Sequence, residues 1–407
     1  NMQIPIINGI YTDINSDFRT SYPINLVPVP KENGISQGYL RPADGVDLFA
    51  TGQGVDRGAI NWDGLMYRAS GSKLIRVNSN GTVDVIGEIG NDNLPVTFDY
   101  SFDYLAVASN NDLFLYDGVT LTQVTDVDLG NVLDFVWIDG YFVTTDGSFL
   151  VVTELNDPFA VSPLKYGSSE VSPDPIIAVL KLRNEIYAVN RYSIEVFANV
   201  GGDLFPFQRI NGALIERGAI GNKACAVFMD SIAFVGSAQK ESIGVYLGVN
   251  GQSQKISTRE IDQVLASYTD TQLSTILVET RAIDSHNFLY IHLPDRTFVF
   301  DGNATSVMQQ PIWFALKTDT KYKLRHFIYC YSDWYCGDSD TSKVGKIANS
   351  HSRYYGANTD WEFATQIAYN ESNGAMIHEI ELVALTGNTA SASSTISTSY
   401  SVDGQTW

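Results

Sequence analysis

Histidines and cysteines are the residues of this chain best suited to bind a metal, and their spacing argues against a metal site. The histidines show neither HxH nor HExxH spacing: His286, His292, His326, His351 and His378. Asp338 and Asp340 alternate around Ser339 as in a calcium loop, but the rest of that pattern is missing, which favours a solvated turn. Three cysteines, Cys225, Cys330 and Cys336, are too few for a zinc site or a disulfide framework. Cys330 and Cys336 could face each other across one hairpin, although reduced, buried thiols are favoured. We expect no metal and no cofactor.

Arginines offer the other possible chemistry, because a cluster of three guanidinium groups can bind the carboxylate of an acidic sugar. The candidates are scattered: Arg183, Arg191, Arg209, Arg217, Arg281, Arg296, Arg325 and Arg353. Ser401 to Trp407 comes within one residue of the S-x-D-x-G-x-T-W box of sialidases, a motif that stabilises a turn and takes no part in catalysis. We expect no catalytic residue. The alternative to a protein without catalysis is a carbohydrate-binding or sialidase-like propeller. That alternative requires three arginines to meet at one face of the protein.

The elements that would position such residues form a repeat. Residues 277–302 read as strand, turn, strand, turn, strand, with period-two alternation broken by Asp, Asn, Pro and Gly. Similar hairpins begin near Ala59, Val96, Val132, Ile176, Ala224, Leu277 and Arg325. Repeats of roughly 40–50 residues predict a β-propeller. We expect seven four-stranded blades, with six blades and an edge hairpin as the alternative.

Composition is consistent with a large β protein. Hydrophobic content of 44% allows a sizeable core, and 46 acidic against 26 basic residues give a formal charge of −20. Phosphate binding requires clustered Lys and Arg, so this balance argues against a protein that grips nucleic acid. The opening residues lack the features of a signal peptide, and no apolar run approaches the length of a membrane span, so we expect synthesis in a cytoplasm.

Both ends of the chain depart from the repeat. Residues 1–55 are rich in Pro, Asn, Gly and Ser, which predicts an extended arm. That arm either lies over its own propeller or reaches a neighbouring subunit. Beyond residue 360 we expect three longer strands, Glu362–Tyr369, Ile377–Thr386 and Thr395–Val402, with a Ser/Thr/Ala linker at 387–394. They would begin a small β-sandwich that we expect to be incomplete. The predicted division is arm 1–55, propeller 56–360 and C-terminal β module 361–407.

Two insertions inside the propeller stand out. The segment 193–221 contains a Gly201-Gly202 break and the aromatic group Phe205-Pro206-Phe207. In the segment 258–276, Ile261, Val264, Leu265 and Tyr268 fall at helical spacing, and Asp270 could cap a following turn. One short amphipathic helix, or two, is predicted there.

These insertions carry a resemblance to one family. The runs SIEVF, PFQRINGALIERG, REIDQVLASYTDTQL and LYIHLPDRTFVFDG, with YPINL and GYLRP near the start, occur in this order. Together they resemble the packaged-DNA stabilisation, or tail hub, proteins of short-tailed phages of enteric bacteria. The resemblance implies a non-enzymatic virion protein that forms a hexameric ring below the portal and its adaptor ring. Such a ring closes the channel over the packaged DNA, holds the tail needle and tailspikes, and opens for genome ejection.

If the resemblance holds, the functional residues are those that touch a neighbouring subunit or another tail protein. The candidate subunit or partner contacts are Tyr39, Arg41, Phe205, Phe207, Ile261 and Leu265. DNA would pass through the lumen of the ring without specific binding. A scaffold for soluble host proteins is a third possibility, since propellers often serve as scaffolds.

Overall fold

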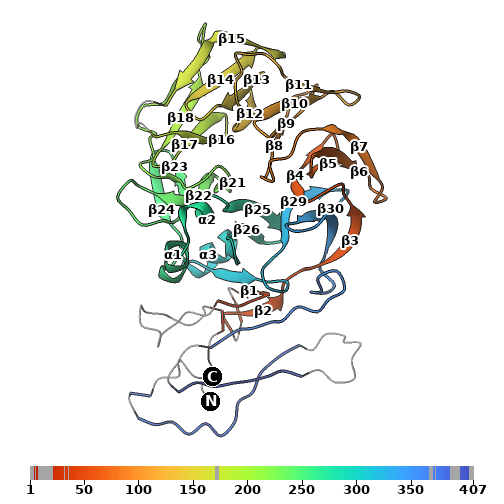
Figure 1. Cartoon of the computed structure of the whole chain (residues 1–407). Helices are drawn as coiled ribbons and strands as arrows, with labels where there is room; N and C mark the ends of the chain where they lie inside the picture. The colour runs from red at the N-terminus through yellow and green to blue at the C-terminus, as the bar shows by residue number, and fades with distance from the viewer. Residues whose placement is uncertain are drawn as a thin grey trace.

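Seven antiparallel sheets are arranged around one axis in the computed structural model (Figure 1), so the protein is a seven-bladed β-propeller. The structure describes residues 4, 6–7, 22–31, 33–34, 36–169, 174–365, 370–371, 373–385 and 395–402. The seven hairpins expected from the sequence all supply the inner strands of blades. Six blades have four strands, and the fifth has five because two short strands, β20 and β21, share the inner position against β22.

The strands of each blade run outward from the axis in chain order. The first three blades consist of β4 (Asp56–Trp62), β5 (Leu65–Ser70), β6 (Lys73–Val77) and β7 (Val83–Glu88); β8 (Thr97–Tyr100), β9 (Leu105–Ser109), β10 (Asp112–Tyr116) and β11 (Leu121–Gln123); and β12 (Asp134–Ile138), β13 (Tyr141–Thr145), β14 (Phe149–Glu154) and β15 (Asp157–Ser168). The fourth and fifth consist of β16 (Ile176–Leu182), β17 (Glu185–Asn190), β18 (Ile194–Asn199) and β19 (Phe207–Arg209), then β20 (Gly218–Ala219), β21 (Cys225–Phe228), β22 (Ser231–Ser237), β23 (Gly244–Val249) and β24 (Gln252–Lys255). The sixth consists of β25 (Leu277–Ile283), β26 (His286–His292), β27 (Thr297–Asp301) and β28 (Trp313–Leu316), and the seventh of β29 (Leu324–Cys330), β30 (Asp333–Asp338), β31 (Lys343–Ala348) and β3 (Gly45–Thr51).

Turn chemistry explains why the hairpins form where they do. Asp63-Gly64 and Asp139-Gly140 both have positive φ at each residue, 52° and 74° in the first pair and 53° and 90° in the second. This is the type I′ geometry that matches the twist of two-residue hairpins, and Asp-Gly adopts it with little strain. The second strand of each hairpin is almost wholly buried, as in β9 and β17, because both of its faces pack against neighbouring blades. The core is therefore a ring of inter-blade clusters.

The N-terminal part of the chain completes the last blade. Strand β3 pairs with β31 in antiparallel register, with Gly45 opposite Ala348 and Thr51 opposite Lys343. Residues 45–51, expected in the arm, thus belong to the propeller ladder. This pairing covers the open edge of β31 and buries Val46 and Ala50, which is the physical reason that the segment joins the blade.

The described part of the arm lies on its own propeller. Strands β1 (Leu26–Pro30) and β2 (Gly38–Pro42) form a hairpin, and Ile24 makes a parallel bridge with Ala315 at the edge of the sixth blade. We call residues 22–44 the strap. The described residues of the strap, 22–31, 33–34 and 36–44, therefore lie against their own propeller, as one of the two interpretations expects.

Three helices interrupt the β structure. Helices α1 (Arg259–Ala266) and α2 (Asp270–Leu273) confirm the two helices expected in 258–276, but Thr269, not Asp270, caps the second. Helix α3 (Gly302–Met308) was not expected from the sequence, where Asp301-Gly302 looked like a strand end. The Asp301 side chain accepts hydrogen bonds from the backbone N–H groups of Asn303 and Ala304 and so caps this helix.

The C-terminal residues differ from the sequence expectation. The described parts of the three predicted strands carry no regular strand, and Glu362 makes only an isolated bridge with Ile24. Alternating apolar residues form a ladder only beside a partner strand, and the described residues 373–385 have none. Residues 366–369, 372, 386–394 and 403–407, which include most of the linker and of the Asp-box-like end, lie outside the described residues.

Candidate assembly surfaces

The candidate arginines come from different blades and loops of the propeller. Four of the eight candidates are held by carboxylates: Arg209 by Glu195, Arg217 by Glu241, Arg281 by Asp44 and Arg296 by Asp295. A guanidinium group already paired with a carboxylate is not available to a substrate carboxylate. The geometry therefore gives the sialidase-like alternative no support.

Metal and ligand sites find no support either. The described residues contain no group of three His, Cys, Asp or Glu side chains that could hold an ion. Asp338, one of the carboxylates suggestive of calcium, is fully buried and accepts hydrogen bonds from the N–H groups of Asp340 and Thr341, so it forms a turn. Two cavities, of about 20 and 160 Å³, are smaller than the roughly 300–1,000 Å³ of a typical ligand pocket.

Side chains cross the axial channel of the propeller. Asn222, between β20 and β21 of the fifth blade, donates a hydrogen bond from its Nδ2 (2.9 Å) to the carbonyl of Leu133 beside the third blade. Its neighbour Lys223 contacts the hydroxyl of Thr97 in the second blade. These blades are not adjacent, so the contacts span the axis at the end where the inner strands begin. A DNA duplex cannot pass through the centre of this propeller.

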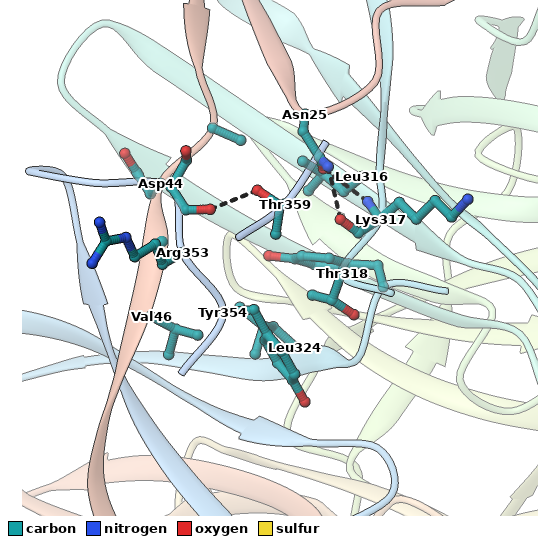
Figure 2. Close-up of a pocket in the computed structure, with 14 residues that line it drawn as sticks. Asn25, Asp44, Val46, Leu316, Lys317, Thr318, Leu324, Arg353, Tyr354 and Thr359 are labelled. Carbon is teal, nitrogen blue, oxygen red and sulfur yellow. Dashed lines mark hydrogen bonds between the residues drawn. The ribbon is translucent and has the colours of Figure 1, made fainter. Parts of the chain in front are cut away.

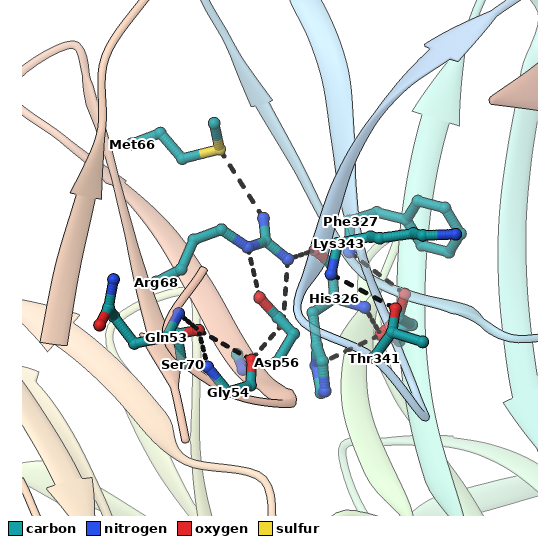
Figure 3. A network of polar contacts seen from close by, with 12 residues as sticks. Gln53, Gly54, Asp56, Met66, Arg68, Ser70, His326, Phe327, Thr341 and Lys343 are labelled. Carbon is teal, nitrogen blue, oxygen red and sulfur yellow. Dashed lines mark hydrogen bonds and ion pairs between the residues drawn. The ribbon is translucent and has the colours of Figure 1, made fainter. Parts of the chain in front are cut away.

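A buried polar network joins the first and last blades (Figure 3). The Arg68 guanidinium donates to both carboxylate oxygens of Asp56, at 2.6 and 3.0 Å, and to the carbonyl of His326 in the seventh blade at 3.0 Å. Arg68 is 0% and Asp56 5% exposed. Burial raises the pKa of the Asp56 carboxyl, against the opposing effect of Arg68. Because both groups are desolvated, loss of either one would leave the other charge buried without its partner.

Glu279 extends this network into the sixth blade. Its carboxylate accepts hydrogen bonds from the backbone N–H groups of His326 and Phe327, at 2.9 and 3.3 Å. Burial by itself would raise the pKa of Glu279, but its interaction with His292 and the hydrogen bond from the backbone N–H of His326 outweigh burial and bring the pKa to about 2. Burial lowers the pKa of His326 to about 3. The interface between the sixth and seventh blades therefore holds an ionised carboxylate beside neutral histidines.

Asn25 ties the strap to two other segments (Figure 2). Its Nδ2 donates to the carbonyls of Lys317 and Asp360, both at 2.8 Å, and its Oδ1 accepts from the Lys317 N–H at 2.9 Å. Asn25 is 5% exposed and has a φ of 58°, a conformation that Asn tolerates better than most residues. One side chain thus joins the strap, the edge of the sixth blade and the C-terminal link.

Two predicted contacts lie on the strap hairpin. Tyr39 is 45% exposed on β2, and the Lys31 ammonium lies 5.2 Å from the centre of its ring. Arg41 is partly exposed and forms an ion pair with Asp44 at 3.3 Å. Both side chains can reach a partner.

The other four predicted contacts lie in two separate places, and three of them are buried. Phe207 is 4% exposed and packs against Tyr141, while Ile261 and Leu265 of α1 are both 0% exposed. These side chains shape their loops from beneath and cannot touch a partner in this conformation. Phe205 is partly exposed and covers Gly167 of the third blade, where an added Cβ would lie 2.4 Å from its ring.

Sequence reasoning missed three highly exposed large apolar side chains of the propeller. Phe102, Val119 and Val127, all on loops of the second blade or just after it, are 96%, 88% and 91% exposed. Phe102 and Val119 lie in the β8–β9 and β10–β11 turns at one end of the second blade, whereas Val127 lies on the β11–β12 link at the other end. Single exposed residues are ordinary, but two of them at one end of a blade indicate contact. Their signal in the sequence is an apolar residue next to Asp or Gly inside a turn.

A propeller with a crossed axis, a tied strap and several exposed apolar loops has the features of a structural contact protein. The comparisons agree. Residues 2–352 match the family model described as Bacteriophage P22 Gp10, beta-propeller, and residues 360–407 match its companion, Bacteriophage P22 Gp10, beta-sandwich. The chain belongs to the Bacteriophage P22 Gp10 family of phage tail hub proteins, structural parts of the virion.

One relative and one solved structure illustrate the match. The chain is 28% identical over 411 residues to the tail hub protein gp10 of Salmonella phage P22, covering 95% of this chain and 84% of that protein. The WD40 domain of Neurospora crassa Pan2 superimposes with a TM-score of 0.50 at 8% identity, covering 76% of this chain and 97% of that domain, which concerns the fold alone. The β-sandwich expected at the C-terminus is thus supported by the family match. In the described part of the chain, no helix has the length and apolar character needed to cross a bilayer.

Proposed function

We propose that this tail hub protein assembles as a homohexameric ring beneath the portal and its adaptor ring. There it closes the channel over packaged DNA, holds the tail needle and tailspikes, and opens for genome ejection. It acts without catalysis or cofactor and is made in the host cytoplasm. The propeller is the rigid block of the ring and includes β3, so the arm ends near residue 44 and not at residue 55. The β module of residues 361–407 is a separate unit.

The crossed axial channel is the observation that carries this proposal beyond family membership. Because Asn222 and Lys223 reach across the axis to non-adjacent blades, DNA has no route through a single copy. A channel that DNA traverses must then lie between copies, as in a ring. The formal charge of −20 favours passage of DNA without adhesion.

The exposed predicted contacts fit such a role. Tyr39 and Arg41 on the strap, and Phe205 on the loop before β19, are accessible to a neighbouring subunit or to another tail protein. We propose these three as contact residues, with Phe207, Ile261 and Leu265 supporting the loops from within.

Mixing purified protein with a portal–adaptor complex tests the proposal. Native mass spectrometry should show discrete addition of about six copies, whereas bovine serum albumin should not add. A gel-shift titration with duplex DNA at about 50 mM salt should show no salt-sensitive binding by the protein alone. The proposal is contradicted if no copy adds to the complex, or if the protein alone binds DNA tightly and in a salt-dependent way.

A further inference from the structure

Formal charge is distributed unevenly around the propeller. Between Arg76 and Lys165 the chain has 14 acidic residues and no Lys, Arg or His. Five of the 14 form ion pairs with basic residues from outside the stretch, so the local excess of negative charge is smaller than 14: Asp84, Glu88, Asp92, Asp99 and Glu154. It builds β7 and nearly all of the second and third blades. Asp103, Asp117, Asp128, Asp139 and Asp157 are exposed there. We call the surface of β8–β15 the acidic face.

The acidic face also carries the exposed apolar side chains. Phe102 and Val119 lie beside Asp103 and close to Asp117, in the two turns at one end of the second blade. An apolar group ringed by charges of one sign is typical of a docking surface for a protein of opposite charge. A surface built only to repel DNA would not need the apolar groups.

The opposite side of the molecule has the complementary character. Residues 317–353, which form most of the seventh blade and the link after it, contain seven Lys or Arg and four Asp, a formal +3. Lys317 and Arg353 are exposed, and on the strap, the seventh blade and the C-terminal link Tyr39, Tyr329 and Trp361 are 45%, 52% and 54% exposed. We call residues 317–353 together with the strap and Trp361 the basic face. Figure 1 shows β9–β15 at one end of the propeller and the β1–β2 hairpin at the other.

We propose that the acidic face of one copy docks on the basic face of a second copy of this chain. This proposal rests on the proposed ring, whose subunit contact it specifies. Two acidic faces repel each other, so the contact is head to tail, and a head-to-tail contact builds a ring when its rotation closes. The second copy is favoured over an unrelated basic protein because the chain itself supplies the complementary surface.

Cysteine cross-linking on the portal–adaptor complex tests the arrangement. The three native cysteines are at most 7% exposed, so Asp103→Cys and Arg353→Cys introduce the reactive thiols. With a flexible bis-maleimide, the double variant should give a ladder of linked copies, and each single variant should give none. Dimers from Asp103→Cys alone would indicate a two-fold contact, and links to the adaptor would indicate a different partner; either result overturns the proposal.

Charge exchange gives an independent readout. Asp103→Lys with Asp117→Lys, or Lys317→Glu with Arg353→Glu, should lower the number of complete rings about tenfold at physiological salt, because like charges then face each other. Combining all four changes should restore ring formation. Asp230→Lys with Glu216→Lys is the matched control, because both residues are exposed and lie outside the two faces. Equal loss in the control, or no recovery in the combined variant, overturns the proposal.

The outcomes separate the two proposals. If about six copies add to the portal–adaptor complex but no ladder forms, the subunit contact is wrong while the tail hub function stands. If no copies add, the ring itself fails and the subunit contact fails with it.

Discussion

Replacing Asn25 should release the strap from the propeller. The side chain makes three hydrogen bonds, to Lys317 twice and to Asp360 once. Each contributes about 1 kcal/mol, and alanine at a φ of 58° adds about 1 kcal/mol of backbone strain. Asn25→Ala should therefore weaken closure of the strap by about 4 kcal/mol. Asn25→Gly should cost about 3 kcal/mol, because glycine adopts this conformation without strain.

Hydrogen exchange measures this local opening directly. The backbone N–H of Ala43 bonds to the carbonyl of Asn25, and that of Glu362 bonds to the carbonyl of Ile24, so both amides report on the strap. A loss of about 4 kcal/mol corresponds to a protection factor roughly a thousandfold lower. Amides of β9, far from the strap, should keep their protection and serve as the internal control.

Two results would refute this reasoning. If protection at Ala43 and Glu362 falls less than tenfold in Asn25→Ala, the side chain does not hold the strap. If Asn25→Ala and Asn25→Gly behave alike, the positive φ stores no strain. Asn25→Asp should lose as much protection as Asn25→Gly or more, since a carboxylate would face two carbonyl oxygens.

Three further predictions concern the buried groups. Arg68→Met should lower the free energy of unfolding by about 3–5 kcal/mol, because it leaves Asp56 buried without its partner; adding Asp56→Asn should recover part of this loss in urea unfolding, and no recovery would contradict the pairing. Stability should fall as the pH drops below about 6.5, because His326, with its folded pKa near 3, takes up a proton more readily in the unfolded chain, and it should fall further below about 4.5 as Glu279, with its folded pKa near 2, is protonated. His326→Asn, which suits the φ of 58° at that position, should flatten the upper part of this pH profile, and an unchanged profile would exclude His326 as its source. The native protein should not react with a thiol reagent at pH 8, since burial raises the pKa of Cys336 to about 12 and all three cysteines are buried, whereas the unfolded protein should release three equivalents.

Local chemistry made the blades predictable from the sequence. Asp63-Gly64 and Asp139-Gly140 each mark a tight hairpin without reference to the rest of the chain, and the buried second strands read as apolar runs. Strand β3 of the seventh blade was wrongly assigned to the arm. Its partner β31 lies nearly 300 residues away. A pairing over that distance leaves no local signal.

The contact residues were harder to predict because exposure depends on packing. Ile261 and Leu265 have the same helical spacing whether they face a partner or their own core, and they face the core. Phe205 and Phe207 are two residues apart in one aromatic group, yet only Phe205 remains partly exposed. By contrast, the stretch without a single basic residue was present in the sequence, but its meaning depends on the blades being placed side by side.

The late pairing of β3 sets an order of events during synthesis. Lys343, the first residue of β31, follows Thr51, the last residue of β3, by 292 residues. At translation rates of about 5–20 residues per second, β3 waits roughly 15–60 s on the ribosome for its partner. Throughout that time β3 has no partner strand, and the side of the first blade that will pack against the seventh is open to other nascent chains. The host's chaperones therefore have a defined interval in which to act, and premature release would yield an open propeller unable to join a tail.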